Sequence, residues 1–493
     1  MTRWFAALKP DSIWDWIAAA ACIPLLAWLV YAQALLPNSP EHKIDWPWAQ
    51  RDHAPHVTIH NNDFKHFFLG AVLLKRGGNP YHYENLQQAR RDFGIDSGIN
   101  PFVYPPFNGI AMWWLTPSDV KPPSFRQFSD AATLWNRMQY VLLALSAACI
   151  LLLIGDEKFW LKLAALLGVL AFSWPLTRTI TAGQVNMVLL AVYCAAPLLL
   201  RWRLIPGAGI LAAFGAWYKL APGALLFYFC ARRRWWSAIW FVGAAIVIVL
   251  LALLLVGARV HLDYWPLLRD MGYGKSTWAE HSMEYHLEAS NQSINSFLLH
   301  AFSENAVKNP ANKTTPWVNL GAGAANGLTY AVALALLAGM AWLTWRLSKV
   351  REDDAGAPYD APERLAYSLW IFVSLLIPSL MWDHYCLLLL PAQMFMLDAI
   401  LRMERRGAAF GFSIAAWLIA AILIDWKFPF AVASWNPRFQ AADLDWLARI
   451  GITDYRSGVG IIVEKHKLFG TLLLLALNAT LLAPTLKRST HKA

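Results

Sequence analysis

Charged residues are scarce in this chain: they make up 15% of its 493 residues, whereas hydrophobic residues make up 57%. A set of soluble domains needs a larger charged surface, so this composition excludes that class. The apolar residues run for about twenty positions without alternating with polar ones, which excludes a transmembrane β-barrel. The sequence therefore predicts an all-α, polytopic membrane protein with one integral membrane domain over residues 1–493.

Cysteine is also scarce, and the five cysteines have no paired spacing. All of them lie in apolar segments, so we expect reduced thiols and no disulfide framework. The chain has no glycine-rich phosphate loop, no HExxH motif and no cysteine cluster, which argues against a nucleotide-triphosphate or zinc enzyme. We therefore expect neither a metal nor a cofactor.

The basic residues give the chain a formal net charge of +10. They gather in short clusters between apolar runs, a pattern typical of cytoplasmic loops and unlike a nucleic-acid-binding surface. The clusters are Arg201 with Arg203, Arg232 to Arg234, Arg402 with Arg405 and Arg406, and Lys487 with Arg488. We expect membrane lipids as neighbours and no nucleic acid as a partner.

The apolar runs predict about twelve transmembrane helices. These runs are 13–36, 131–154, 159–177, 185–200, 204–218, 220–231, 236–256, 324–346, 366–381, 385–401, 408–424 and 467–485. With both termini cytoplasmic, every basic cluster falls on the cytoplasmic side, and the long loops 37–130, 257–323 and 425–466 face the opposite side. If residues 107–115 were a further crossing, the Arg201 and Arg232 clusters would fall on the opposite side. We therefore expect these residues to form an interfacial helix.

Two pairs of apolar runs are too short to be two ordinary crossings each, which would need about 40 residues. Residues 204–231 and 366–401 are better explained as shallow hairpins, with tips at Tyr218-Lys219 and at Trp382 to Tyr385. Charged groups at membrane depth are costly unless they line a wet cavity or meet a partner, so these tips are candidate functional sites. The alternative is that the tips sit in the outer headgroup region.

The first long loop contains a candidate general base. Asp63 is flanked by Lys65 and His66, and a carboxylate in a membrane-facing loop can deprotonate a hydroxyl of a substrate presented at the interface. Other carboxylates compete with it in the same loop: Asp52, Glu84, Asp92 and Asp96. Tyr104 begins a Tyr-Pro-Pro-Phe sequence whose prolines predict a rigid turn before a surface helix.

Two further segments carry polar residues. Arg178 and the sequence from Gly183 to Asn186 precede the fourth apolar run, where a helix N-terminus would favour an anion, and Lys219 is expected on the same side. The alternative is that Gln184 and Asn186 are only caps and interhelical donors. His286, Glu288 and the Asn291-Gln292-Ser293 run in the second long loop suit hydroxyl recognition, although an ordinary amphipathic loop helix would look similar.

The order of these motifs resembles glycosyltransferase family 87 over roughly residues 60–400. The motifs are Asp63-Phe64, Gly78 to Tyr81, Tyr104 to Phe107, Gly183 to Asn186, Lys219 to Pro222, Asn291 to Ser293 and Trp382 to Tyr385. The resemblance implies a GT-C architecture, a polyprenyl-phosphate-sugar donor, and no nucleotide or metal. It also implies that Asp63 is the catalytic base and that His384 lies near the donor phosphate or the acceptor.

The chain departs from the family pattern by having one histidine where two are common, so Tyr385 is expected to replace the second as a hydrogen-bond partner. We expect Arg178, Lys219, Gln184 and Asn186 to bind the donor phosphate. We expect these residues to bind the remainder of the substrates: His66, Tyr81, Tyr104, Asn291, Gln292, Asp383 and Tyr385.

The sequence thus favours an inverting hexosyltransferase, with mannose as the default sugar and a lipid or glycan as the acceptor. Its active site would face the extracytoplasmic side of a bacterial inner membrane. A secondary transporter or lipid flippase is the alternative from another class, because it would share the helices and the polar tips. A non-catalytic scaffold within an envelope-polysaccharide assembly is a third.

Overall fold

The chain folds as a bundle of helices. The computed structural model describes residues 10, 12–35, 62–95, 99–117, 122–276, 284–304, 313–350, 359–403, 407–425 and 457–487. Within these ranges the secondary structure is helical, apart from two isolated β-bridges. The prediction of an all-α protein is therefore confirmed.

Seven helices in these ranges are long and apolar enough to cross a membrane. They are α2 (Ile13–Val30), α6 (Phe125–Ile154), α12 (Trp235–Val256), α15 (Ala322–Val350), α17 (Leu390–Leu401) with the preceding 3₁₀ turn η8 (Asp383–Leu389), α18 (Ala408–Asp425) and α22 (His466–Lys487). An eighth span is formed if α7 (Phe159–Phe172) and α8 (Trp174–Ala182), which meet at 55°, are counted as one. The chain is a membrane protein, but the expected twelve crossings are not confirmed.

The number of candidate spans is lower than the expected twelve because four of the apolar runs form short helices. These are α9 (Asn186–Arg201), α10 (Ile205–Tyr218), α11 (Ala224–Ala231) and α16 (Ala361–Leu376). A 16-residue helix such as α16 is about 24 Å long, which is less than the roughly 30 Å of a hydrocarbon core. Every residue of α16 from Glu363 to Leu376 is buried in the protein. Its apolar sequence therefore reflects packing against other helices and not contact with lipid.

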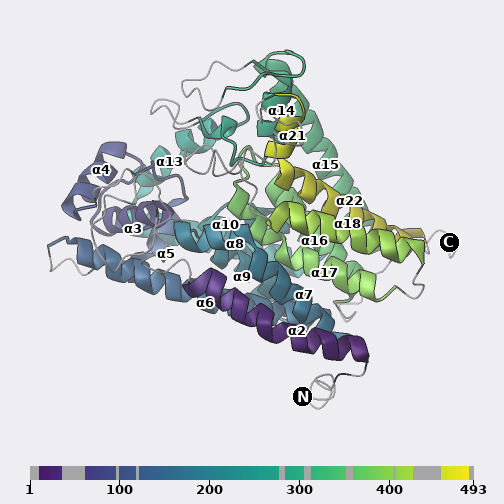
Figure 1. The fold of residues 1–493 in the computed structure, drawn as a ribbon. Helices are drawn as coiled ribbons and strands as arrows, with labels where there is room; N and C mark the ends of the chain where they lie inside the picture. The colour runs from purple at the N-terminus through teal and green to yellow at the C-terminus, as the bar shows by residue number, and fades with distance from the viewer. Residues whose placement is uncertain are drawn as a thin grey trace.

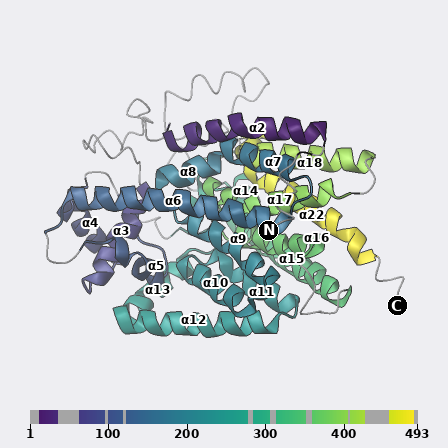
Figure 2. The ribbon, with the colours of Figure 1, turned by 90° about the horizontal axis from the view of Figure 1, so that it is seen from below.

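Lipid-facing helices lie at the edges of the bundle. Figure 2 shows α2 and α12 at opposite edges, with the other helices between them. Along α12, Leu254 is 81% exposed and Trp236 is 66% exposed, as expected for side chains that contact hydrocarbon. The inner side of α12 packs closely on α10: a Cβ at Gly209 would lie 2.3 Å from the carbonyl oxygen of Ser237. Glycine is therefore required where these two helices meet.

Short helices gather at one end of the bundle (Figure 1). They are α3 (Asn62–Lys75), α4 (Tyr83–Asp92), α5 (Pro106–Ala111) and α13 (Ala258–Asp270) on one side, and α14 (Ile294–Phe302) and α21 (Val459–Glu464) on the other. The first turn of α2 and the last turn of α22 lie at the opposite end. Residues 107–115 form only α5 and a 3₁₀ turn (Trp113–Leu115), so they are too short to be a thirteenth crossing.

Parts of the predicted loops lie outside the described residues. These parts are residues 37–61, 96–98 and 118–121 of the first long loop, residues 277–283 and 305–312 of the second, and residues 426–456 of the third. The termini, the basic residues Arg405, Arg406 and Arg488, and the competing carboxylates Asp52 and Asp96 also lie outside the described residues. Which side of the membrane each loop faces stays a prediction.

Basic residues form ion pairs inside the bundle, and among them are Arg232 and Arg234 of the clusters that predicted the topology. Glu363 at the start of α16 pairs with Arg232 at 2.7 Å and with Arg234 at 3.1 Å. Asp398 on α17 has Lys162 of α7 2.5 Å away and also contacts Arg364. These clusters join α7, α11, α16 and α17 at their ends, so the basic residues stabilise the bundle as well as marking its loops.

Candidate functional site

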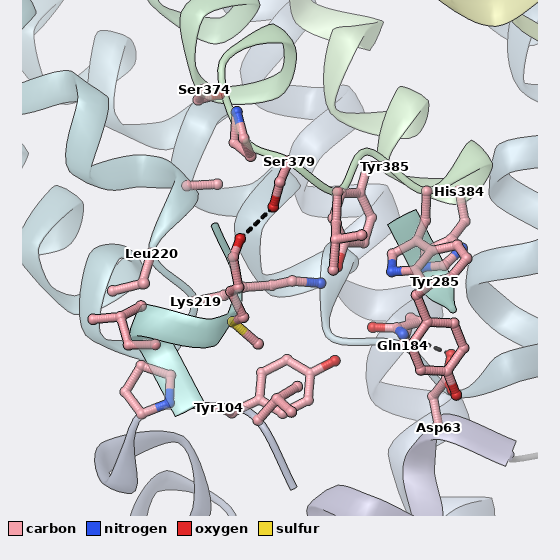
Figure 3. Close-up of a pocket in the computed structure, with 18 of the residues that line it drawn as sticks. Asp63, Tyr104, Gln184, Lys219, Leu220, Tyr285, Ser374, Ser379, His384 and Tyr385 are labelled. Atoms are coloured by element: carbon pink, nitrogen blue, oxygen red, sulfur yellow. Dashed lines mark hydrogen bonds between the residues drawn. The ribbon is translucent and has the colours of Figure 1, made fainter. Parts of the chain in front are cut away.

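A cavity of about 1040 Å³ lies where the short helices meet the bundle. Its wall combines the start of α3, the segment before α5, the end of α8, the tip after α10, the end of α13 and the segments 285–288 and 373–385. Figure 3 shows side chains from these distant segments converging on one space. The cavity brings together most of the residues that the sequence singled out: Asp63, His66, Tyr104, Arg178, Gln184, Lys219, His384 and Tyr385.

Asp63 lies in the first turn of α3 and is held there by the core. The following residues Phe64, Phe67 and Phe68 are at most 1% exposed, so α3 is anchored in the protein by its aromatic side. The Asp63 carboxylate accepts a 2.6 Å hydrogen bond from Nε2 of Gln184 (Figure 3). The anchored helix α3 and the hydrogen bond from Gln184 together fix the direction in which the Asp63 carboxylate faces.

Gln184 owes its place to the tight turn between α8 and α9. Gly183 has φ +67°, a left-handed conformation that favours glycine, and it ends α8. Trp135 of α6 donates from its indole to the Gly183 carbonyl at 2.8 Å, and the backbone N–H of Gln184 donates to Thr179 at 2.9 Å. The turn is thus tied to two helices, and α9 begins directly after it at Asn186.

Lys219 follows α10 and extends toward the centre of the cavity (Figure 3). Its Nζ donates to Oδ1 of Asn186 at 3.3 Å. It also lies 3.8 Å from the ring centroid of Tyr385 and 5.5 Å from that of Tyr104, so two aromatic faces stabilise the ammonium. The tip of the first short hairpin therefore places the Lys219 amine in a cavity, where burial lowers its pKa to about 7 against the opposing effect of Asp63.

His384 lies at the tip of the second hairpin, and Asp383 orients it. Oδ1 of Asp383 is 3.3 Å from Nδ1 of His384 and accepts from the His384 backbone N–H at 2.8 Å. Trp174 donates to the other carboxylate oxygen at 3.0 Å, which completes the support of Asp383. The opposite ring nitrogen, Nε2 of His384, is buried and has no hydrogen-bond partner within the described part of the chain. Because His384 lines the cavity, this nitrogen is available to a ligand.

His66 and Tyr104 are held in their uncharged forms. Burial lowers the pKa of His66 to about 4, against the opposing effect of Asp63. Nε2 of His66 accepts from the backbone N–H of Asn100 at 3.1 Å, a bond that requires this nitrogen to be deprotonated. Burial raises the pKa of the Tyr104 phenol well above its ordinary value, and the neighbouring Tyr385 and Asp63 raise it further.

Five of the expected site residues lie behind the cavity wall: Tyr81, Asn186, Asp383, Asn291 and Gln292. Tyr81 donates from its hydroxyl to the carbonyl of Tyr104 at 2.6 Å and so holds the wall from outside. Asn291 donates to the carbonyls of Tyr285 and Ser379, both at 3.2 Å, and it is fully buried. The structure gives these side chains positions that support the wall, and their contact with a substrate stays a prediction.

The cavity also contains Tyr285, which the sequence did not select, and it contains Glu288 and Trp382, which the sequence indicated only as parts of a polar loop and of a hairpin tip. Glu288 stands in a loop with several polar residues, and no spacing distinguishes it from His286, which does not line the cavity. Trp382 reaches Tyr285 because residue 382 pairs with Asn291 in an isolated antiparallel bridge. No local sequence pattern predicts that bridge.

Comparison with known proteins identifies the family. The family model described as Glycosyltransferase family 87 matches residues 102–379, which is more than half of the chain. The chain belongs to glycosyltransferase family 87. No match was found among curated proteins or among solved structures.

This glycosyltransferase has its candidate site partly inside and partly outside the matched segment. Tyr104, Gln184 and Lys219 fall within residues 102–379, whereas Asp63 and His384 fall outside them. Asp63 is joined to the matched segment by its bond to Gln184, and His384 by the 3.2 Å bond from Asn186 to its carbonyl. The geometry therefore extends the site of the glycosyltransferase beyond the segment that the family model covers.

Proposed function

We propose that this membrane glycosyltransferase moves a hexose, with mannose favoured, from a polyprenyl-phosphate donor to a lipid or glycan acceptor. The reaction would take place at the extracytoplasmic face of a bacterial inner membrane and would need no metal or cofactor. The observation that carries this proposal is that Asp63 and Lys219, a base and a cation, line the same largely apolar cavity. Membership of a glycosyltransferase family favours this function over a transporter or flippase.

The donor phosphate would bind at Lys219. An ammonium held among buried aromatic rings loses little to solvent screening, so it would stabilise the charge that develops on the leaving phosphate. Arg178 lines the same cavity and would add a second positive charge. In this proposal Nε2 of His384 accepts a hydrogen bond from a sugar hydroxyl, because Nδ1 keeps its proton toward Asp383.

The lipid chain of the donor would follow an apolar part of the cavity. This part lies next to Lys219. It is lined by Leu220, Ala224, Phe227, Val373 and Ile377. Phe227 is 55% exposed, so the apolar lining continues to the outer surface of the helices. A polyprenyl tail would bury its apolar surface here while its phosphate reaches Lys219.

Asp63 would act as the general base in a single displacement. The acceptor oxygen forms a bond to the anomeric carbon as the bond between that carbon and the phosphate oxygen breaks. The acceptor proton passes to the Asp63 carboxylate, and polyprenyl phosphate leaves with the bonding electron pair. Because attack comes from the face opposite the phosphate, the anomeric configuration inverts.

The test uses purified protein in nanodiscs with a set of radiolabelled polyprenyl-phosphate sugars and an extract of lipids and glycans as acceptors. Asp63→Asn is expected to abolish transfer and to keep donor binding, because it removes the base and preserves the size of the side chain. Asp92→Asn, on exposed α4, is the matched control and should transfer sugar like the wild type. Transfer by Asp63→Asn at the wild-type rate would exclude Asp63 as the base, and no transfer by the wild type from any donor would contradict the proposed function.

A further inference from the structure

A second carboxyl group lines the cavity and has no place in the chemistry described so far. Glu288 lies between the 3₁₀ turn η6 (Tyr285–Leu287) and α14, and Oε2 of Glu288 accepts from the hydroxyl of Ser290 at 3.2 Å. Burial raises the pKa of Glu288 to about 7. A carboxyl group in such a place can both donate and accept hydrogen bonds near neutral pH.

Glu288 lies in the part of the cavity near Asp63. Figure 3 shows Tyr285 beside Asp63 and Gln184, whereas Leu220 and the main chain of Lys219 lie across the cavity. Glu288 follows Tyr285 by three residues, at the end of η6. Both carboxyl groups raise the pKa of the Tyr285 phenol, which agrees with this placement. The Lys219 ammonium contacts Asn186, Tyr104 and Tyr385, which all lie outside this loop.

Two aromatic rings line the cavity together with Glu288. Tyr285 and Trp382 meet edge to face, with ring centroids 5.2 Å apart and planes at 79°. The other neighbour of Trp382 is His384, whose ring lies parallel to it within 6° at 6.5 Å. Both Tyr285 and Trp382 line the cavity, so they present apolar surface beside a carboxyl group.

The wall that carries these side chains is rigid. The backbone N–H of Asp383 donates to the Ser290 carbonyl at 3.0 Å, and that of Gln292 donates to Met381 at 2.6 Å. Lys465 donates from Nζ to the carbonyl of Glu288 at 3.2 Å. Glu288 is thus placed by its backbone as firmly as Asp63 is placed by α3.

We propose that Tyr285, Glu288 and Trp382 form the subsite for the acceptor, and that the acceptor is an uncharged sugar ring. This inference rests on the proposed function, because a displacement requires the acceptor to approach from the side of the anomeric carbon opposite the leaving phosphate. With the phosphate at Lys219 and the base at Asp63, that side is the one occupied by Tyr285 and Glu288.

The side chains of the subsite match the chemistry of a pyranose. A sugar ring has an apolar C–H face that packs on aromatic rings and a rim of hydroxyls that hydrogen-bond to a carboxyl group. Two carboxyl groups, Glu288 and Asp63, face this half of the cavity. Arg178 also lines the cavity, but it is shared between Glu288 and Asp383, since it interacts electrostatically with both carboxyl groups. A carboxylate on the acceptor ring would therefore meet more negative than positive charge, so the subsite selects against acidic sugars.

The test compares two soluble acceptor probes, an octyl glucoside and the octyl glucuronide that differs from it only at C6, with one labelled polyprenyl-phosphate sugar as donor. For the wild type we expect transfer to the glucoside and at least about tenfold less to the glucuronide. Glu288→Gln removes the charge and should bring the ratio of transfer to the glucoside over transfer to the glucuronide closer to one. Glu288→Ala removes the hydrogen bonds as well, so it should raise the acceptor KM at least about tenfold and change the donor KM less than twofold.

Glu84→Gln, on exposed α4, is the matched control and should leave both KM values and the glucoside-to-glucuronide ratio unchanged. An unchanged ratio in Glu288→Gln together with an unchanged acceptor KM in Glu288→Ala would overturn the subsite while the proposed function stands. Equal rises in donor and acceptor KM would also overturn it, because they would indicate a general effect on the wall. If the wild type consumes no polyprenyl-phosphate sugar, with or without an acceptor, the proposed function fails and the subsite fails with it.

Discussion

The side-chain amide of Gln184 donates a 2.6 Å hydrogen bond to the carboxylate of Asp63. The bond joins α3 to the turn between α8 and α9, and it keeps one carboxylate oxygen occupied. The other oxygen is left to take a proton. Gln184 is in this arrangement a positioning residue for Asp63.

Replacing Gln184 with Met should therefore lower kcat more than it raises KM. Loss of one hydrogen bond to a charged group corresponds to about 1.5–3 kcal/mol, or roughly 10- to 150-fold in rate if the bond is needed in the transition state. Steady-state transfer assays would measure the change, with Gln88→Met on exposed α4 as the control. A rise in KM alone would indicate that Gln184 binds substrate and does not position Asp63.

Replacing Lys219 with Gln should weaken the donor side of the reaction. The neutral amide keeps a bond to Asn186 but loses the charge for the donor phosphate, so the donor KM should rise about 10- to 100-fold. Lys275→Gln, at an exposed position outside the cavity, is the control. An unchanged donor KM and kcat would show that the phosphate binds elsewhere.

Stability should depend strongly on the buried ion cluster around Asp398. Asp398→Asn leaves Lys162 and Arg364 buried without their shared partner, which costs about 3–5 kcal/mol for clusters of this kind. Thermal unfolding in detergent should show a lower midpoint. Asp130→Asn breaks only the exposed pair with Arg126 and should leave the midpoint unchanged; equal midpoints for both variants would contradict this prediction.

The pKa of Glu288 predicts a pH dependence of stability. In the unfolded chain its carboxyl group titrates near 4.5, whereas burial raises the folded-state pKa to about 7. Between these values the folded state binds more protons, so the contribution of Glu288 to stability falls as the pH rises from about 4.5 to about 7. Arg178 and Lys465 lower this pKa, and the hydroxyl of Ser290 lowers it as well.

Glu288→Gln should remove this dependence. The midpoint difference between Glu288→Gln and the wild type should grow as the pH rises through that range and level off above it. Thermal unfolding at a series of pH values would measure it. A difference that stays constant from pH 5 to pH 8 would contradict a raised pKa for Glu288.

Sequence reasoning reached the helical class, the family and the residues whose chemistry is unusual for their location. Lys219 could be found because a charge between two short apolar runs is costly unless it meets a partner, and the structure supplies Asn186 and Tyr385. The same reasoning overcounted the crossings, because an apolar run does not show whether it faces lipid or protein. The clearest case is α16, which is buried in the protein from Glu363 to Leu376.

The second carboxyl group shows where such reasoning stops. Asn291 and Gln292 were expected to bind substrate because they belong to a motif of the family, whereas Glu288 was one polar residue of the same loop. The side chains of Asn291 and Gln292 hold backbone groups behind the wall. The direction in which each side chain of this loop points is set by its pairing with residues 379–383, about ninety positions away. A single sequence contains no signal for that pairing.

The fastening of residues 288–292 also sets an order for biosynthesis. Lys465 holds the carbonyls of Glu288 and Asn291, and Gln292 donates to the carbonyl of Glu464. The ribosome makes these anchors more than a hundred and fifty codons after the loop that they hold. A nascent chain can therefore insert α2 to α17 before the residues that hold this part of the cavity wall have been made.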